Sequence, residues 1–178
     1  MTYPVFASGD VLNASDMNSV GLWLIKQQTI GNGVSSVVVP DVFSSKYDNY
    51  KIIVNGGVGS ATQAIRLQLT GSSAGYYGAH IVATYSTGAV TGNPISAASS
   101  WSFAGVSTPD QNFVDCDILS PYLAKPAGIT GAYINASTTG NGGTINGYHA
   151  SLYQATGFTL SVTGTMTGGV IFVYGYRY

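Results

Sequence analysis

Glutamate is absent from the 178-residue chain, and all seven acidic residues are aspartate. Lys and Arg together number six, so charged residues make up 7% of the chain, compared with about a quarter in an ordinary soluble domain. Lys and Glu usually decorate exposed helices, so their scarcity argues against long solvent-facing helices. With so little charge, solubility must come from hydroxyl and amide groups, and association with other chains is easy.

The sequence also lacks the features of several functional classes. A formal net charge of −1, with scattered basic residues, offers no electrostatic footprint for nucleic acid. No run of about twenty apolar residues is present to insert into a membrane, and the opening MTYPVFASGD shows no secretory signal peptide. Cys116 is the single cysteine, so no intrachain disulfide is expected.

The abundant residues favour β-structure. Twenty-four Gly, thirteen Tyr and many Val, Thr and Ile suit short strands joined by tight turns. From Leu22 onward the apolar period is two, clearest in AIRLQLTG, where Ile65, Leu67 and Leu69 alternate with polar residues. Turn signals such as VNGGVGSA, TGNP and TTGNGGTING separate the strand candidates. The pattern predicts a single all-β domain, an antiparallel, jelly-roll-like β-sandwich of about ten strands.

The first residues differ from the rest of the chain. Asn13 lies three residues before Asp16, an arrangement typical of a helix N-terminus, and predicts a short helix over residues 14–20. Apolar residues of this stretch are spaced to lie on one side: Leu12, Met17 and Val20. We therefore expect an N-terminal docking segment, residues 1–25, that precedes the β-sandwich domain, residues 26–178.

One pair of acidic residues has a spacing that suits chemistry. Asp115 and Asp117 project from one face of a predicted strand, about 7 Å apart, which fits part of a calcium site or the acid/base pair of a glycan hydrolase. No second acidic cluster converges on them, so carboxylates that face solvent or accept turn amides are the simpler interpretation. Cys116 points to the opposite face and is expected to be a buried, unreactive thiol.

Other reactive residues lack a supporting motif. His80 and His149 have no HxxxH or HxH spacing, and they can share a site only if their strands pair. The glycine stretches NGGVGSA and GNGGTING fit neither GxGxxG nor the Walker spacing, and no GxSxG turn positions a nucleophile. We expect no metal, no cofactor and no enzymatic activity.

Tyrosine, serine, glycine and asparagine together are typical of adaptable binding surfaces. Aromatic residues that could stack on a sugar ring or fill a groove of a partner are Tyr76, Tyr77, Tyr85, Trp101 and Tyr122. The alternative is that half of these side chains pack in the core or between subunits.

The stretch GGVIFVYGYRY, residues 168–178, carries apolar side chains on both faces of a strand. One face can fill the core, and the other needs a second cover, from a subunit neighbour or from the leader segment. We expect Ile171, Val173 and Tyr176 to contribute to an oligomer interface.

Two stretches resemble a known family. FASGDVLNASDMNSVGLWLIKQQTIGNGVSSVVVPDVFSSKYDNYKIIVNG, residues 6–56, resembles the N-terminal part of small virion proteins of tailed bacteriophages, with their Gly-Asp-Val-Leu leader, Trp-containing segment and Phe-Ser-Ser-x-Tyr strand entry. GFTLSVTGTMTGGVIFVYGYRY, residues 157–178, resembles the closing strands of the same proteins. Asn13 stands where Thr is usual, residues 57–155 show no resemblance, and the repetitive shaft of large fibres is missing.

The resemblance implies a structural protein of the phage particle, assembled in the cytoplasm of the host bacterium. Such proteins are commonly homotrimeric and dock to the virion through the leader, here with Val11, Leu12, Met17, Val20 and Trp23. Its partners are then itself and other capsid or tail proteins, and a tail-fibre-like or minor tail protein would also bind host-surface glycans. The alternatives are a capsid decoration protein, a glycan hydrolase that uses Asp115 and Asp117, and a soluble cellular lectin.

Overall fold

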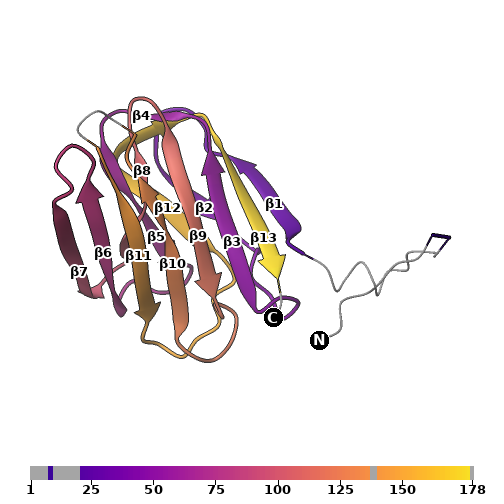
Figure 1. Ribbon diagram of the computed structural model, residues 1–178. Coiled ribbons are helices and arrows are strands. Elements are labelled where there is room, and N and C mark those ends of the chain that lie inside the picture. Colours follow the sequence, from indigo (N-terminus) through magenta and orange to yellow (C-terminus); the bar gives the residue numbers. More distant parts are fainter. Residues whose placement is uncertain (1–7, 10–20, 137–139, 177–178) are drawn as a thin grey trace.

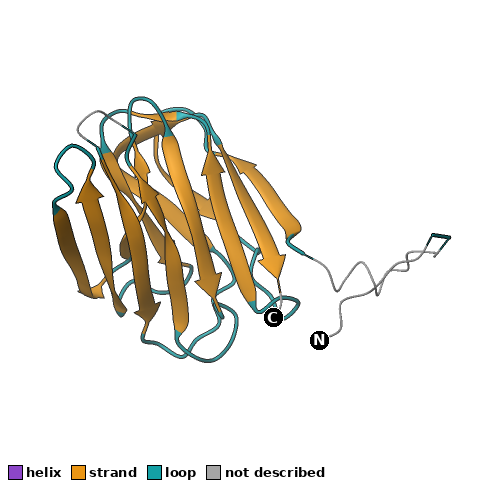
Figure 2. Cartoon of the chain, in the orientation of Figure 1, coloured by secondary structure: helices purple, strands orange, loops and turns teal. Residues whose placement is uncertain are grey.

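The computed structural model describes residues 8–9, 21–136 and 140–176. Thirteen strands and no helix lie within these ranges (Figure 2). The strands are β1 (Trp23–Thr29), β2 (Val34–Val39), β3 (Asn49–Asn55), β4 (Val58–Gly59), β5 (Gln63–Leu69), β6 (Tyr76–Thr84), β7 (Val90–Ala98), β8 (Trp101–Ser107), β9 (Asn112–Leu119), β10 (Ala127–Ile134), β11 (Asn141–His149), β12 (Phe158–Thr167) and β13 (Val170–Tyr176). The all-β prediction is confirmed, whereas the helix expected over residues 14–20 lies outside the described residues.

All strand pairs are antiparallel, and the thirteen strands form one sheet that folds into two layers (Figure 1). The front layer has the order β1-β13-β3-β9-β10-β11-β6-β7. Strand β9 also pairs with β8, which begins the back layer β8-β5-β12-β2, and β4 adds to β12. The front layer is thus the broader one, and its outer face is the largest continuous surface in this view.

Side chains that alternate along each strand fill the space between the layers. The predicted inward positions of β5, Ile65, Leu67 and Leu69, are confirmed, because all three are buried. Large buried side chains from both layers pack with them: Trp101, Tyr50, Tyr76, Phe158, Ile52, Ile118, Ile145, Leu160 and Met166. This core accounts for the apolar period of two that the sequence shows from Leu22 onward.

Two segments whose residues favour turns contribute to strands. The TGNP signal lies inside β7, an edge strand, where Pro94 costs little because an edge strand does not need every backbone N–H for pairing. Residues 141–147 of the glycine-rich TTGNGGTING lie in β11, which pairs with β6 and β10. Gly143 is required there, since a Cβ at this position would overlap the Ile81 carbonyl oxygen. The count therefore rises from the ten or so expected strands to thirteen.

Strand β13 lies between β1 and β3, so it is an interior strand of the front layer. Ile171 and Val173 are fully buried against the back layer within this one chain. Their expected place in an oligomer interface is therefore wrong, because the core of the same chain already covers them. The opposite, outer face of β13 is the one that another chain or segment could cover, and there Phe172, Tyr174 and Tyr176 are half-buried.

Candidate functional site

The outer face of the front layer brings side chains of five strands into one row. Tyr174 on β13 lies opposite Lys51 on β3, and Lys51 lies opposite Asp117 on β9. The row continues to Thr130 on β10 and Asn146 on β11. Because side chains directly opposite each other on neighbouring strands lie close together, this register places an aromatic ring, a cation, a carboxylate, a hydroxyl and an amide side by side.

Lys51 lies between two carboxylates. Its Nζ forms an ion pair with Asp115 Oδ1 and a second one, at 3.5 Å, with Asp117 Oδ2. The Lys51 side chain is only 25% exposed. Burial acts to lower its pKa, but the hydrogen bond with Asp115 and the negative charges of both carboxylates outweigh it, and the pKa of Lys51 is raised. The cluster thus carries one positive and two negative charges, with the ammonium held in place.

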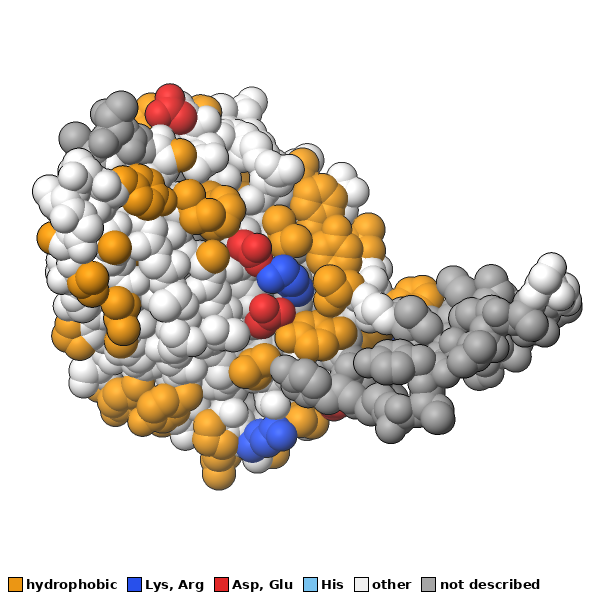
Figure 3. Space-filling view, in the orientation of Figure 1, with side chains coloured by type: hydrophobic (Ala, Val, Ile, Leu, Met, Phe, Trp, Pro, Cys, Tyr) orange, Lys and Arg blue, Asp and Glu red, His pale blue; other side chains and the backbone are white. Residues whose placement is uncertain are grey.

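Aromatic side chains of β13 border this cluster. The Tyr176 hydroxyl donates a hydrogen bond of 3.0 Å to Asp117 Oδ1. Phe172 and Tyr174 follow on the same face, with ring centroids 6.4 Å apart and nearly parallel planes. Leu24 on β1, opposite Tyr174, is exposed beside them. Figure 3 shows hydrophobic side chains gathered on this side of the charged group.

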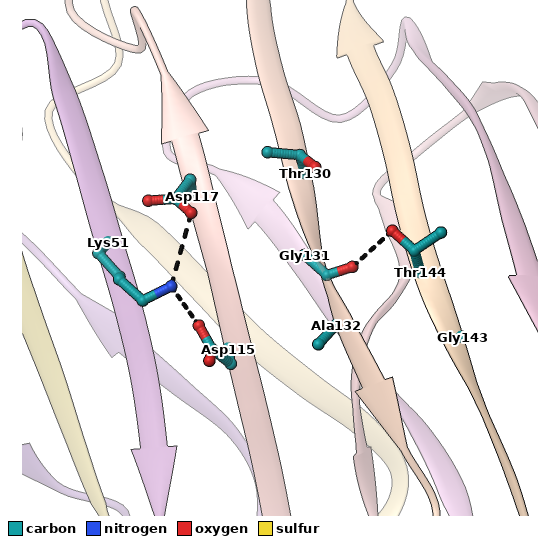
Figure 4. Close-up of a pocket in the computed structure, with 8 residues that line it drawn as sticks. All are labelled: Lys51, Asp115, Asp117, Thr130, Gly131, Ala132, Gly143 and Thr144. Carbon is teal, nitrogen blue, oxygen red and sulfur yellow. Dashed lines mark hydrogen bonds and ion pairs between the residues drawn. The ribbon is translucent and has the colours of Figure 1, made fainter. Parts of the chain in front are cut away.

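A shallow hollow of about 340 Å³ lies on the other side of the cluster. Its lining comes from β3, β9, β10 and β11: Lys51, Asp115, Asp117, Thr130, Gly131, Ala132, Gly143 and Thr144 (Figure 4). Small side chains form the floor, whereas large aromatic side chains stand on β13. The size is at the lower end of the range for small-molecule sites, which begins near 300 Å³.

Hydrogen bonds fix the polar groups on the floor of the hollow. Thr130 Oγ1 donates to Asn146 Oδ1 at 2.8 Å, and Asn146 Nδ2 donates to Thr144 Oγ1 at 3.3 Å. Thr144 Oγ1 in turn donates to the Gly131 carbonyl oxygen at 2.9 Å. These side chains are exposed or half-buried, so their remaining acceptor positions can meet a ligand.

Gly131 allows β10 to pass close to β9 at this hollow. A Cβ on Gly131 would lie 2.6 Å from Cys116 Cβ and 2.7 Å from the Asp115 carbonyl oxygen. Any other residue would therefore push the two strands apart directly beneath the carboxylates. Cys116 itself is fully buried, and burial raises the pKa of its thiol, which agrees with the unreactive thiol expected from the sequence.

The aromatic residues proposed as ligand contacts do not form one exposed surface. Tyr76 and Trp101 are fully buried, with ring centroids 5.0 Å apart, so assigning them to a binding surface is wrong. They are the large apolar side chains on which the two layers pack. Tyr77 is half-buried and Tyr85 is exposed, whereas Tyr122 packs against the core.

Of the residues expected to dock to a virion, only Trp23 lies within the described part of the chain. It begins β1 opposite Gly175, so the proposed docking segment, residues 1–25, runs into the first strand of the sheet. Val11, Leu12, Met17 and Val20 lie outside the described residues.

The two histidines are buried on paired strands but do not share a site. His80 lies opposite Ile145, and its ring stacks on Phe103 at 4.3 Å. His149 lies opposite Tyr76, and its Nε2 is 2.7 Å from Ser72 Oγ. Within the described ranges, no group of three or more His, Cys, Asp or Glu side chains is placed to hold a metal ion.

Sequence reasoning identified Asp115 and Asp117 but missed Lys51. Their common face is confirmed, since both ion-pair with the same ammonium group. The alternation of YKIIVNG could have indicated Lys51, because it places Lys51 and Ile53 on one face of a strand. The chain has only six basic residues, so a lysine on a strand is a distinctive feature. Pairing β3 with β9 could not be deduced from that alternation, because more than fifty residues separate them.

Comparisons with protein-family models, with curated proteins and with solved structures find no match. In the part of the chain that the structure describes, there is also no helix of the length and apolarity needed to cross a membrane.

Proposed function

We propose that this chain is a non-enzymatic structural protein of a tailed-bacteriophage particle, a tail-fibre-like or minor tail protein that assembles as a homotrimer and binds the host surface. Its partners are copies of itself and other phage capsid or tail proteins, and it is found in the virion after assembly in the bacterial cytoplasm. The proposal does not involve a cofactor.

The observation that carries this proposal is the outer face of β13. Phe172, Tyr174 and Tyr176 lie half-buried on that face in the segment whose sequence resembles the closing strands of small virion proteins. A row of aromatic side chains in a chain with 7% charged residues is costly to leave in water and suits a surface that meets another protein.

We further propose that the folded sheet is a jelly-roll-like β-sandwich. The two-layer arrangement in Figure 1 and the single large core cluster between the layers support this class. Such a unit suits a particle protein, because its edge strands have features that hinder pairing with strands of other chains. Strand β7 carries Pro94, and β1 has a bulge between Leu24 and Lys26, so assembly is directed to faces rather than to strand edges.

A capsid decoration protein is the second candidate. The same aromatic face supports it, since a clamp between capsomers needs an apolar contact surface and no ligand. A glycan hydrolase has less support. The Lys51 ammonium lies between the carboxylates of Asp115 and Asp117, where a hydrolase would hold the sugar.

The decisive experiment is cryo-electron microscopy of the phage that carries this chain, at subnanometre resolution. Density for the two-layer β domain on the tail is the expected result, and density on the shell would favour decoration. If the chain occurs nowhere in the particle, the virion proposal is wrong. Native mass spectrometry tests the oligomer, where a monomer at micromolar concentration would contradict the trimer.

A further inference from the structure

We infer that the hollow lined by Lys51, Asp115, Asp117, Thr130 and Thr144 is a carbohydrate-binding site for uncharged glycans. This deepens the proposed function, on which its biological role rests, by naming the ligand class and the place where it binds. The site is formed by rigid strands of the front layer and by none of the connecting loops.

The first argument is shape. A pyranose ring is a flat, rigid disc with hydroxyl groups at its edge, and it needs an open depression rather than a deep cavity. The hollow is open, with a volume of about 340 Å³, and it is floored by Gly131, Ala132 and Gly143. On this face the floor is the Ala132 methyl group and the backbone at Gly131 and Gly143, whose side-chain positions point to the inner face, so no large side chain rises into the hollow.

The second argument is the mixture of hydrogen-bonding groups. Each sugar hydroxyl is both a donor and an acceptor, so a site for it needs both kinds within a short distance. The carboxylates of Asp115 and Asp117 accept, the Lys51 ammonium donates, and the Thr130 and Thr144 hydroxyls, whose protons are donated to Asn146 Oδ1 and to the Gly131 carbonyl oxygen, accept. Ion pairs and the Thr–Asn–Thr network fix these groups before a ligand arrives, which lowers the entropic cost of binding.

The third argument is the aromatic border. The Tyr176 hydroxyl is hydrogen-bonded to Asp117, so its ring lies beside a carboxylate that lines the hollow. The apolar C–H face of a sugar can pack on this ring while the sugar hydroxyls point to the polar floor. The expectation of a sugar on an aromatic surface is thus transferred from Tyr76 and Trp101, which are buried, to Tyr176 on β13.

Charge selects among possible ligands. Two carboxylates and one ammonium leave a net negative charge, so a phosphate, sulfate or uronic acid would be repelled. A metal ion would have to displace the Lys51 ammonium from both carboxylates. A neutral hexose, deoxyhexose or N-acetylhexosamine avoids both costs.

The test is a titration of the isotopically labelled full chain, followed by amide shifts in NMR spectra. The probes are neutral oligomers of glucose, galactose, mannose, rhamnose and N-acetylglucosamine, with oligogalacturonate as the acidic comparison. At least one neutral oligomer should shift the amides of residues 115–117, 130–132 and 143–144 at millimolar concentration. Oligogalacturonate should not.

Two variants locate the site. Asp117→Asn and Thr144→Val should each weaken binding about tenfold, the effect of losing one hydrogen bond in a polar site. Matched controls are Asp110→Asn in an exposed turn and Thr91→Val on exposed β7, which should bind as the unmodified chain does. Unchanged spectra elsewhere would show that each variant is folded.

Tyr77 on β6 and Tyr148 on β11 stack with ring centroids 5.3 Å apart and offer a competing aromatic surface. Three outcomes would overturn the inference: no shift with any neutral oligomer, shifts centred on Tyr77 and Tyr148 instead, or equal binding of oligogalacturonate. None of them bears on where the chain lies in a phage particle. Failure of the glycan site and failure of the virion proposal are therefore separate results.

Discussion

The Tyr176 hydroxyl on β13 donates a hydrogen bond of 3.0 Å to Asp117 on β9, although strand β3 lies between the two strands. The bond crosses the outer face and holds one carboxylate oxygen while the other faces the Lys51 ammonium. Aromatic and charged side chains from three strands are thereby joined into one surface. The behaviour of that surface, and of the core beneath it, can be tested by substitution.

Replacing Lys51 by Met should lower the free energy of unfolding near neutral pH by about 0.5–1 kcal/mol, the usual size for a partly exposed ion pair. The raised pKa of Lys51 means that its contribution is present below about pH 10.5 and is lost as the pH rises through the folded-state value. Urea unfolding of the two proteins at neutral pH measures the difference. Lys125→Met, at an exposed turn, is the control.

Acid should weaken the fold through His80. Burial lowers the pKa of this histidine, so the unfolded chain takes up a proton at higher pH than the folded chain. Stability is therefore complete above about pH 6.5 and falls as the pH drops toward the lower folded-state value, by about 1.4 kcal/mol for each unit between them. His80→Phe keeps a flat ring beside Phe103 but cannot take up a proton. Between about pH 7.5 and 5, a range that spans the ordinary histidine pKa, this variant should lose less thermal stability than the unmodified chain. An identical loss in both proteins would contradict this assignment.

Gly131→Ala should be strongly destabilising, by about 1–3 kcal/mol or more, because the new Cβ would lie 2.6 Å from Cys116 Cβ. Gly92→Ala on β7 is a matched control, since its Cβ would meet nothing within 4 Å. Denaturant unfolding of the two variants should separate them clearly. Similar denaturation midpoints for the two variants would mean that β9 and β10 can move apart without a loss of stability.

The two faces of β13 should respond differently. Ile171→Ala creates a cavity in the core and should cost about 2–5 kcal/mol of stability. The double replacement of Phe172 and Tyr174 by Ser should cost less stability but should abolish the trimer in native mass spectrometry. A trimer that survives the double replacement would exclude this face as the subunit contact.

Truncation after Gly169 removes β13 and leaves β1 without a pairing partner among the described strands. It should also open one side of β3 and expose the core between the layers. We expect no soluble folded protein, which expression and size-exclusion chromatography can check. A well-behaved truncated protein would show that β13 is dispensable.

The alternation of apolar and polar residues along the chain was sufficient to predict much of the fold. Alternation identified the inward side chains of β5, and the same period placed Asp115 and Asp117 on one face of β9. It failed for β7 and β11, because Pro94 and the glycines of β11 are turn formers by local preference. Pairing with β6 overrides that preference, as contacts distant in sequence often do.

The amino-acid sequence by itself determined the all-β class, the low surface charge and the two-faced apolar character of β13. Only the tertiary structure decided which face of β13 is core, that Tyr76 and Trp101 are buried, and that Lys51 meets two carboxylates. The reason is physical. Alternation states which side chains share a face, whereas the partner of that face depends on strand pairings between segments far apart in the chain.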